Sequence, residues 1–204
     1  MASVYDLKPK FQALLRPLLR GLRAVGFSPN GLTLLALAGS FAMGAWLWLW
    51  PGRAALIAVP VWLFIRMALN ALDGMMAREM QMASRLGAIL NETGDVLADA
   101  AIYLPFAWVA APLAGSLFVL GALFTEFCGL LSQTLGAGRS YRGPLGKSDR
   151  AFLAGALALL ALWRPETTAY WPGIFAVAAA LELLTGINRI IPALRRPALR
   201  QETP

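Results

Sequence analysis

Residues 70–95 read NALDGMMAREMQMASRLGAILNETGD, a polar, acid-bearing stretch within an otherwise apolar chain. Carboxylates are expensive inside a membrane and persist there mainly where they bind ions or take part in chemistry. Four residues of this stretch are spaced i, i+3, i+4 and i+7, on one face of a helix: Asn70, Asp73, Gly74 and Ala77. Three more recur every four residues: Asn91, Asp95 and Asp99. The stretch therefore predicts two helices that turn oxygen-bearing side chains toward each other.

The composition predicts a polytopic membrane protein of one domain, residues 1–204. The chain is 58% hydrophobic and only 14% charged. No cleavable signal peptide is evident, and the single cysteine excludes an internal disulfide. Histidine is absent, so any acid–base or metal chemistry rests on Asp, Glu, Asn, Lys or water. The basic residues are not interleaved with aromatics, which excludes a typical nucleic-acid surface.

Apolar stretches long enough to cross a membrane, about 20 residues each, predict an all-α fold with six transmembrane helices. The predicted spans cover residues 30–50, 54–78, 86–111, 113–136, 151–163 and 171–190. The distribution of basic residues tests this assignment, because cytoplasmic loops carry an excess of Lys and Arg. The assigned basic residues, Arg189 among them, fall on one side, and the opposite side receives only Arg53 and Arg164. We therefore expect a protein of the cytoplasmic (inner) membrane with both termini in the cytoplasm.

The N-terminal segment 5–24 has apolar residues at helical spacing opposite Lys and Arg residues. This pattern predicts an amphipathic helix that lies on an anionic membrane surface, although a solvated basic tail would also explain the charges. The bundle would then extend over residues 30–190, followed by a basic cytoplasmic tail at 191–204.

The central stretch resembles the CDP-alcohol phosphotransferase (CDP-alcohol phosphatidyltransferase) family, which carries D-x-x-D-G-x-x-A-R-x8-G-x-x-x-D-x-x-x-D across its second and third spans. The eight matching positions are Asn70, Asp73, Gly74, Ala77, Arg78, Gly87, Asn91 and Asp95. Six are identical, and two family aspartates are replaced by Asn70 and Asn91. The segments 28–33 (SPNGLT) and 143–147 (GPLGK) resemble the family's entry to its first span and its basic loop before the fifth.

The resemblance implies transfer of a substituted phosphate from a CDP-alcohol, commonly CDP-diacylglycerol, to a hydroxyl acceptor, with release of CMP. It also implies a homodimer and a role in phospholipid biosynthesis. The expected cofactor is Mg²⁺ or Mn²⁺, one or two ions, since divalent cations neutralise a pyrophosphate. The implied metal ligands are Asp73, Asp95, Asn70 and Asn91, with Asp95 as the catalytic base. Each asparagine removes one negative charge, for which Asp99 or Glu92 are alternative sources.

Further site residues follow from the same resemblance. Nucleotide and phosphate groups are expected near Gly74, Ala77, Arg78, Gly87, Asn30 and Thr33. The small residues would let a nucleotide approach, or let another helix pack. Arg78 would donate to phosphate oxygens, or anchor the helix end beside Glu79.

The loop 139–150 (RSYRGPLGKSDR) predicts an acceptor-binding surface for a phosphorylated acceptor. Its basic residues are Arg139, Arg142, Lys147 and Arg150. Ordinary positive-inside topology would explain two or three of these charges without any ligand. Three further ionisable residues, Arg66, Glu126 and Glu182, fall within predicted spans, where they would line the cavity or pair with one another.

Two other functions remain open at this point. One is a catalytically silent homologue that binds lipid or a partner, for which the two asparagines are the evidence. The other is a small transporter, which would not require the motif spacing.

Overall fold

The computed structural model describes residues 4–195, and the regular secondary structure of this part of the chain is entirely helical. The elements are α1 (Val4–Ala24), α2 (Pro29–Leu49), α3 (Arg53–Glu79), α4 (Arg85–Trp108), α5 (Pro112–Thr134), α6 (Lys147–Trp163), the 3-10 helix η1 (Pro165–Tyr170) and α7 (Trp171–Leu194). The predicted amphipathic helix and the six predicted helices after it are all present. Residues 196–204, most of the predicted basic tail, lie outside the described residues.

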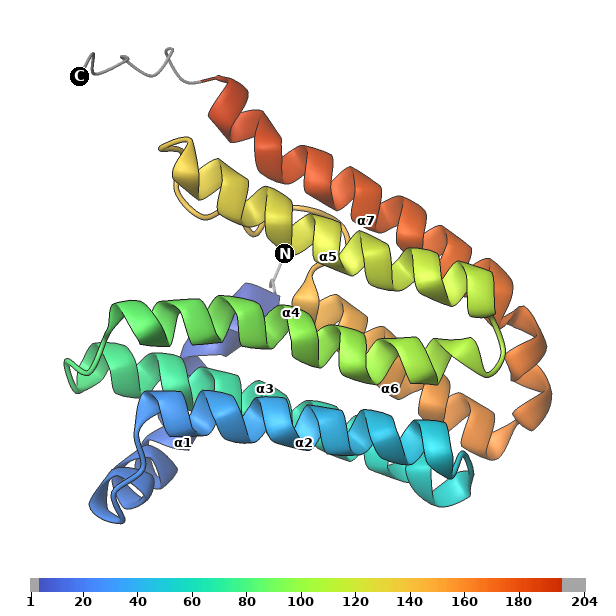
Figure 1. Ribbon diagram of the computed structural model, residues 1–204, viewed down its shortest axis with the longest axis horizontal. Coiled ribbons are helices and arrows are strands. Elements are labelled where there is room, and N and C mark those ends of the chain that lie inside the picture. The colour runs from blue at the N-terminus through green and yellow to red at the C-terminus, as the bar shows by residue number, and fades with distance from the viewer. Residues whose placement is uncertain (1–3, 196–204) are drawn as a thin grey trace.

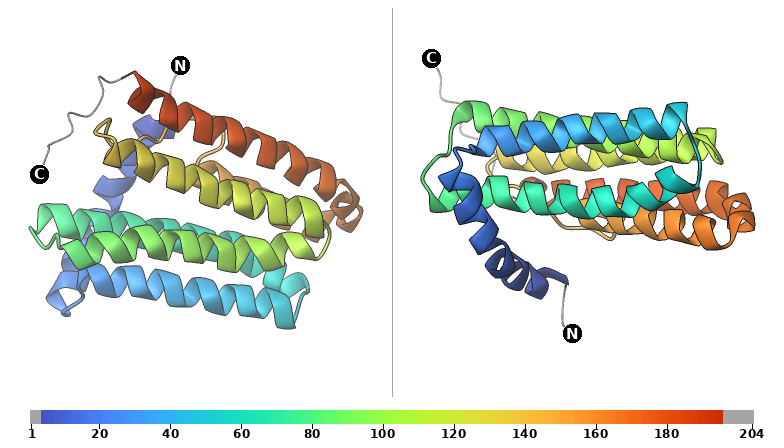
Figure 2. Two further views of the ribbon diagram at one scale, coloured as in Figure 1. Left: turned by 45° about the horizontal axis from the view of Figure 1, so that its top comes forward. Right: turned by 90° about the horizontal axis from the view of Figure 1, so that it is seen from below.

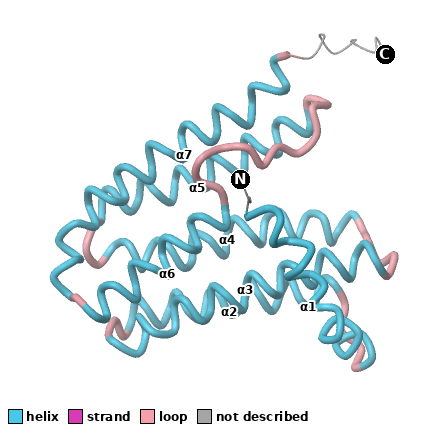
Figure 3. The backbone as a smooth tube through the Cα atoms, turned by 180° about the vertical axis from the view of Figure 1, so that it is seen from behind, coloured by secondary structure: helices cyan, strands magenta, loops and turns pink. Residues whose placement is uncertain are grey.

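The helices form two rows (Figures 1 and 2). In the first row α2 packs against α4, and α4 against α5. The second row lies behind it and consists of α3, α6 and α7; α3 packs against α2, α6 against α3, and α7 against α5 (Figures 2 and 3). Because α2 contacts both α3 and α4, it holds together the two helices that carry the polar stretch.

Four segments are long and apolar enough to cross a membrane: Pro29–Leu49, Arg53–Glu79, Pro112–Thr134 and Pro165–Leu194. Two of the six predicted spans do not meet this criterion. The reason in α6 is its length of 17 residues, and in α4 it is the acidic residues Glu92, Asp95 and Asp99. The fold is thus a multi-pass helical membrane protein, in which α4 and α6 both carry charged groups described below.

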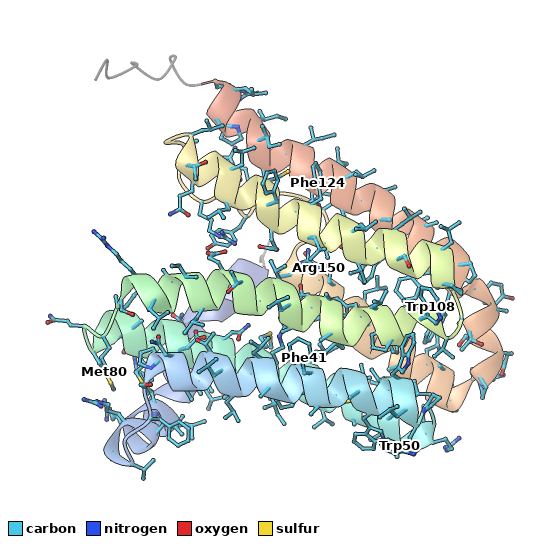
Figure 4. All side chains as sticks on the ribbon, viewed as in Figure 1. Phe41, Trp50, Met80, Trp108, Phe124 and Arg150 are labelled. Carbon is cyan, nitrogen blue, oxygen red and sulfur yellow. The ribbon has the colours of Figure 1, made fainter. Side chains whose placement is uncertain are left out.

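The two ends of the helical bundle carry different kinds of side chain. Trp50 and Trp108 lie at one end and Met80 at the other (Figure 4). The Trp48 and Trp108 ring centroids are 6.1 Å apart at the aromatic end. Tryptophan is enriched at membrane–water interfaces, so this end has the chemistry of an interfacial belt.

Helix α1 continues through Pro9 and Pro17 and packs on α3. Leu15 and Leu19 are buried in a cluster with Leu72, Met75 and Met76, whereas Leu14 and Leu18 are exposed. One apolar edge of α1 is therefore bound to the bundle and another is left free, as in a helix that lies in an interface.

The apolar core between α4, α5 and α7 is aromatic. Phe106 lies 4.8 Å from Trp171 and Phe118 lies 5.2 Å from Phe175, measured between ring centroids. Trp171 is the first residue of α7 and only 2% exposed, so its ring fixes the start of the last helix against α4.

Replacing Trp171 with alanine should therefore lower the free energy of unfolding by about 3 kcal/mol, because a large cavity opens in a packed interior. The same change at Trp163, which is 77% exposed, is the matched control and should have a much smaller effect. Chemical unfolding in detergent micelles measures both. Equal losses in the two variants would contradict the assignment of Trp171 to the core.

Candidate active site

The two halves of the polar stretch lie on consecutive helices joined by a short turn. The first half ends α3 at Glu79, and the second begins α4 at Arg85. Ser84 caps α4, since its hydroxyl accepts a hydrogen bond from the Gly87 backbone N–H at 2.9 Å. Helix α2 packs closely on both helices, whereas α3 and α4 approach each other less closely. The space between them is bridged by long polar side chains.

Asn70 and Asp95 meet across this space, as the spacing predicted. The Asn70 side-chain amide donates to Asp95 Oδ1 at 2.9 Å. One turn earlier on α3, Arg66 donates to the Asp95 backbone carbonyl at 3.1 Å. Lys147, the first residue of α6, forms an ion pair with the same Asp95 oxygen. Asp95 is thus held through Oδ1 by groups from two helices, α3 and α6.

Asp73 is bound from a different direction. Thr33 on α2 donates its hydroxyl to Asp73 Oδ2 at 2.8 Å, and Asp73 is 5% exposed. Thr33 lies in the first turn of α2, whose start is fixed by Ser28 accepting from the Gly31 N–H at 3.1 Å. The N-terminus of a helix carries a partial positive charge and favours anions. The start of α2 therefore belongs to the site.

The glycines of the motif differ in what surrounds them. A methyl group at Gly87 would lie 2.7 Å from Asn30 Oδ1, so this glycine lets α4 approach the start of α2. At Gly74 the three nearest atoms to such a methyl all belong to the flexible Arg78 side chain. Helix packing therefore explains Gly87, whereas the space at Gly74 favours approach of a ligand.

The other motif residues lie near the space between α3 and α4, and none of them makes a contact that assigns it a role. Ala77 and Asn91 are half-buried, and Arg78 is exposed at the end of α3. Arg78 can therefore reach a ligand at the helix end without first leaving an ion pair.

The basic residues of the loop 139–150 do not gather into one surface. Lys147 reaches Asp95, and Arg139 contacts Glu92 at 2.7 Å. Arg142 is exposed. Arg150 lies between α4 and α5 (Figure 4) and is fully buried, bound by Asp99 and Glu126 at 3.0 Å each.

A hollow of about 170 Å³ lies beside Asn70 between α3 and α6. Its polar wall is formed by Arg66, Asn70, Tyr103 and Lys147, and its apolar wall includes Leu63 and Met67. A ligand with a charged head and an apolar body matches both walls.

Sequence reasoning missed several partners in this region. It left Arg66 to line the cavity or to pair with a glutamate; Arg66 does line the hollow, but its closest carboxylate partner is Asp99 at 2.5 Å. It placed Arg189 in the cytoplasmic surface charge, but Arg189 is 2% exposed and contacts Glu126. Glu182 and Arg189 are seven residues apart, on one face of α7; that spacing was the available signal that Arg189 is buried.

Comparison with known proteins gives the family. The sequence profile described as CDP-alcohol phosphatidyltransferase matches residues 27–187. The chain belongs to the CDP-alcohol phosphatidyltransferase family. Its chemistry is transfer of a phosphatidyl group from a CDP-alcohol, and the chain is accordingly a transferase of phospholipid synthesis.

Individual relatives agree with this family. The chain is 47% identical over 191 residues to the inner membrane protein YnbA of Escherichia coli, covering 92% of this chain and 94% of that protein. It is 38% identical over 99 residues to the phosphatidylinositol phosphate synthase of Mycobacterium tuberculosis, a match that covers 48% of this chain and 44% of the synthase.

Solved structures share the fold. The crystal structure of the M. tuberculosis synthase PgsA1 in complex with manganese and citrate has a TM-score of 0.74 at 21% identity, covering 92% of each chain. The same enzyme with CDP-DAG bound has a TM-score of 0.73 at 21% identity, covering 90% of this chain and 98% of that chain.

Restoring the two family carboxylates should strengthen binding of a divalent cation. In Asn70→Asp/Asn91→Asp, two amides become anions beside Asp73 and Asp95, and we expect the Mn²⁺ dissociation constant to fall about tenfold or more. Calorimetric titration of purified protein measures it. The control Asn188→Asp adds a carboxylate on α7. An equal gain there would contradict the placement of Asn70 and Asn91 at the metal.

Proposed function

We propose that this chain transfers a phosphatidyl group from CDP-diacylglycerol to a hydroxyl acceptor and releases CMP. The observation that carries the proposal is the convergence of Asn70, Asp73 and Asp95 beside the start of α2, within a chain of this family. The acceptor oxygen would bond to the phosphorus that carries the lipid, while the bond from that phosphorus to the CMP oxygen breaks.

The donor site follows from the polarity of the surroundings. The pyrophosphate would lie near Gly74, Ala77 and Arg78, where the helix surface is open, and near Asn30 and Thr33 at the α2 N-terminus. The lipid part would lie along the apolar wall of the hollow between α3 and α6. A CDP-alcohol lipid joins these two kinds of surface in one ligand.

A divalent cation fits the residues present, with one ion rather than two. Among the described residues no cluster of three or more His, Cys, Asp or Glu side chains is arranged to hold a metal. Mg²⁺ commonly uses one or two carboxylates and completes its shell with waters and phosphate oxygens. Asp73 and Asp95 supply the carboxylates, and Asn70 and Asn91 supply amide oxygens. When bound, the ion would neutralise charge on the pyrophosphate and on the leaving CMP.

Asp95 is the residue proposed to deprotonate the acceptor. Its Oδ1 is occupied by Asn70 and Lys147, whereas Oδ2 has no hydrogen-bond partner among the described side chains of residues 11–195. The bound oxygen fixes the orientation of the carboxylate, and Oδ2 is the oxygen that would face the cation and take the hydroxyl proton. A general base needs a carboxylate that is fixed in orientation and has one oxygen available, and Asp95 meets both conditions.

A catalytically silent homologue is the second candidate, because Asn70 and Asn91 reduce the negative charge of the motif. The Asn70 amide nevertheless binds Asp95 rather than displacing it, which keeps the proposed base in place. This contact favours the enzyme.

The remaining parts of the proposal concern topology and assembly. We propose one domain with six spans, both termini in the cytoplasm, α1 on the anionic membrane surface, and a homodimer. The basic end of the bundle and the aromatic end support this orientation. Helix α6 is short for a membrane span, and neighbouring helices would shield its charged N-terminal turn from lipid.

Replacing Asp95 with alanine should lower CMP release by about 10²- to 10⁴-fold, the range for loss of a general base. Mass spectrometry of CMP and lipid product, with CDP-diacylglycerol, Mn²⁺ and a panel of acceptors, measures it. Glu166→Gln at the opposite end is the control and should keep full activity. Unchanged CMP release in Asp95→Ala would show that another group is the base, and absence of release from the unaltered protein with every acceptor would favour the silent homologue.

Topology can be tested by labelling single cysteines in a Cys128→Ser background. A cysteine at Ala83, in the α3–α4 turn, should react with a membrane-impermeant maleimide only in inside-out vesicles. One at Glu166, in η1, should react only in right-side-out vesicles. Labelling of both positions from the same side would contradict six spans.

A further inference from the structure

Glu126 on α5 is the centre of a cluster of ion pairs in the bundle. It contacts three arginines from three separate segments: Arg139 at 3.1 Å, Arg150 at 3.0 Å and Arg189 at 3.3 Å. These include two of the four basic residues that the sequence assigned to a phosphorylated acceptor. The Glu126 carboxylate therefore contacts the loop that was predicted to bind the acceptor.

The charges around Glu126 balance. The cations of the connected network are Arg66, Arg139, Lys147, Arg150 and Arg189, and the anions are Glu92, Asp95, Asp99, Glu126 and Glu182. With five formal charges of each sign, this interior has little net positive charge to offer a phosphate. Arg142, the loop arginine outside the network, is exposed. A lone exposed arginine provides little of the enclosure that bidentate phosphate recognition uses.

Several donors of the buried arginines are also in use, although the Nε atoms of Arg150 and Arg189 have no hydrogen-bond partner among the described residues. Arg150 donates to Thr125 Oγ1 at 2.9 Å as well as to its two carboxylates, and Arg189 donates to the Thr125 carbonyl at 2.6 Å. A phosphate would have to displace a carboxylate into an apolar bundle and then lie beside it. Like charges at close range in a low-dielectric region repel strongly.

A neutral hydroxyl meets a different environment. It can donate to a carboxylate and accept from a guanidinium without changing the charge balance. Arg139, Glu92 and Glu126 are partly accessible, with side-chain exposures of 16%, 32% and 11%. The buried Ser140 hydroxyl has no hydrogen-bond partner among the described residues. The partly open edge of the network thus offers paired donors and acceptors of the kind that bind an uncharged polyol.

We propose that Glu126 is a specificity-determining residue, which excludes phosphorylated acceptors and makes an uncharged polyol the acceptor of this transferase. The proposal rests on the proposed function and replaces the phosphorylated acceptor expected from the loop charges. Glu126 neutralises arginines that would otherwise form a phosphate site.

The test uses matched pairs of acceptors that differ by one phosphate, glycerol against glycerol 3-phosphate and myo-inositol against inositol 1-phosphate. CMP release by the full chain in nanodiscs with CDP-diacylglycerol and Mn²⁺ gives kcat/KM for each. The unaltered protein should prefer the neutral member of the pair. In Glu126→Gln the ratio should move toward the phosphorylated member by about tenfold or more, since one anion is removed. Glu166→Gln removes the same charge at a 65% exposed side chain and should leave the ratio unchanged.

Ligand binding, measured by thermal stability, tests the role of Glu126 without requiring catalytic turnover. Phosphorylated polyol or inorganic phosphate should raise the thermal midpoint of Glu126→Gln and leave that of the unaltered protein unchanged. If Glu126→Gln does not fold, Glu92→Gln removes one of the two carboxylates on Arg139 at the accessible edge and should show a smaller gain, because Glu126 remains. Preference of the unaltered protein for a phosphorylated acceptor, or no gain in the folded variant, would overturn the role of Glu126. Absence of CMP release with every acceptor would instead overturn the proposed function, and the midpoint shifts would still decide the role of Glu126.

Discussion

The pairing of Asp99 with Arg66 and Arg150 is the interaction on which the arrangement of the helices depends. These three side chains come from α4, α3 and α6, and each is almost fully buried. Removing one partner of a buried ion pair leaves an uncompensated charge, which costs about 3–5 kcal/mol in proteins. The helices that carry the site are therefore tied to one another by charges that cannot separate without penalty. Glu126 extends the same connection to α5 and α7.

This network also orients the proposed catalytic group. Arg66 binds Asp99 through one nitrogen and the Asp95 backbone carbonyl through another, so the turn of α4 that carries Asp95 is fixed from α3. Lys147 begins α6 only three residues before Arg150, and the burial of Arg150 places the lysine at Asp95. The carboxylates of this region thus differ in their surroundings. Asp99 is buried between two arginines, whereas Asp73 and Asp95 are the carboxylates proposed to face the ligand.

The sequence was sufficient for the helices and for the meeting of Asn70 with Asp95, because both follow from spacing within a short stretch. It was insufficient for the network. Arg150 and Glu126 are 24 residues apart and Arg189 and Thr125 are 64 apart, separations at which no helical period relates one residue to another. The loop arginines therefore looked like surface charge or a phosphate site. Only the packing of α6 against the rest of the bundle shows that Arg150 is buried and already neutralised.

In the proposed function, Asp73 and Asp95 together hold a single divalent cation at the donor site. Electron paramagnetic resonance of Mn²⁺ bound to the purified chain in CDP-diacylglycerol nanodiscs counts the ions directly. We expect one ion per chain, lost in both Asp73→Asn and Asp95→Asn. Two ions of similar affinity, or one ion that persists in either variant, would contradict this proposal.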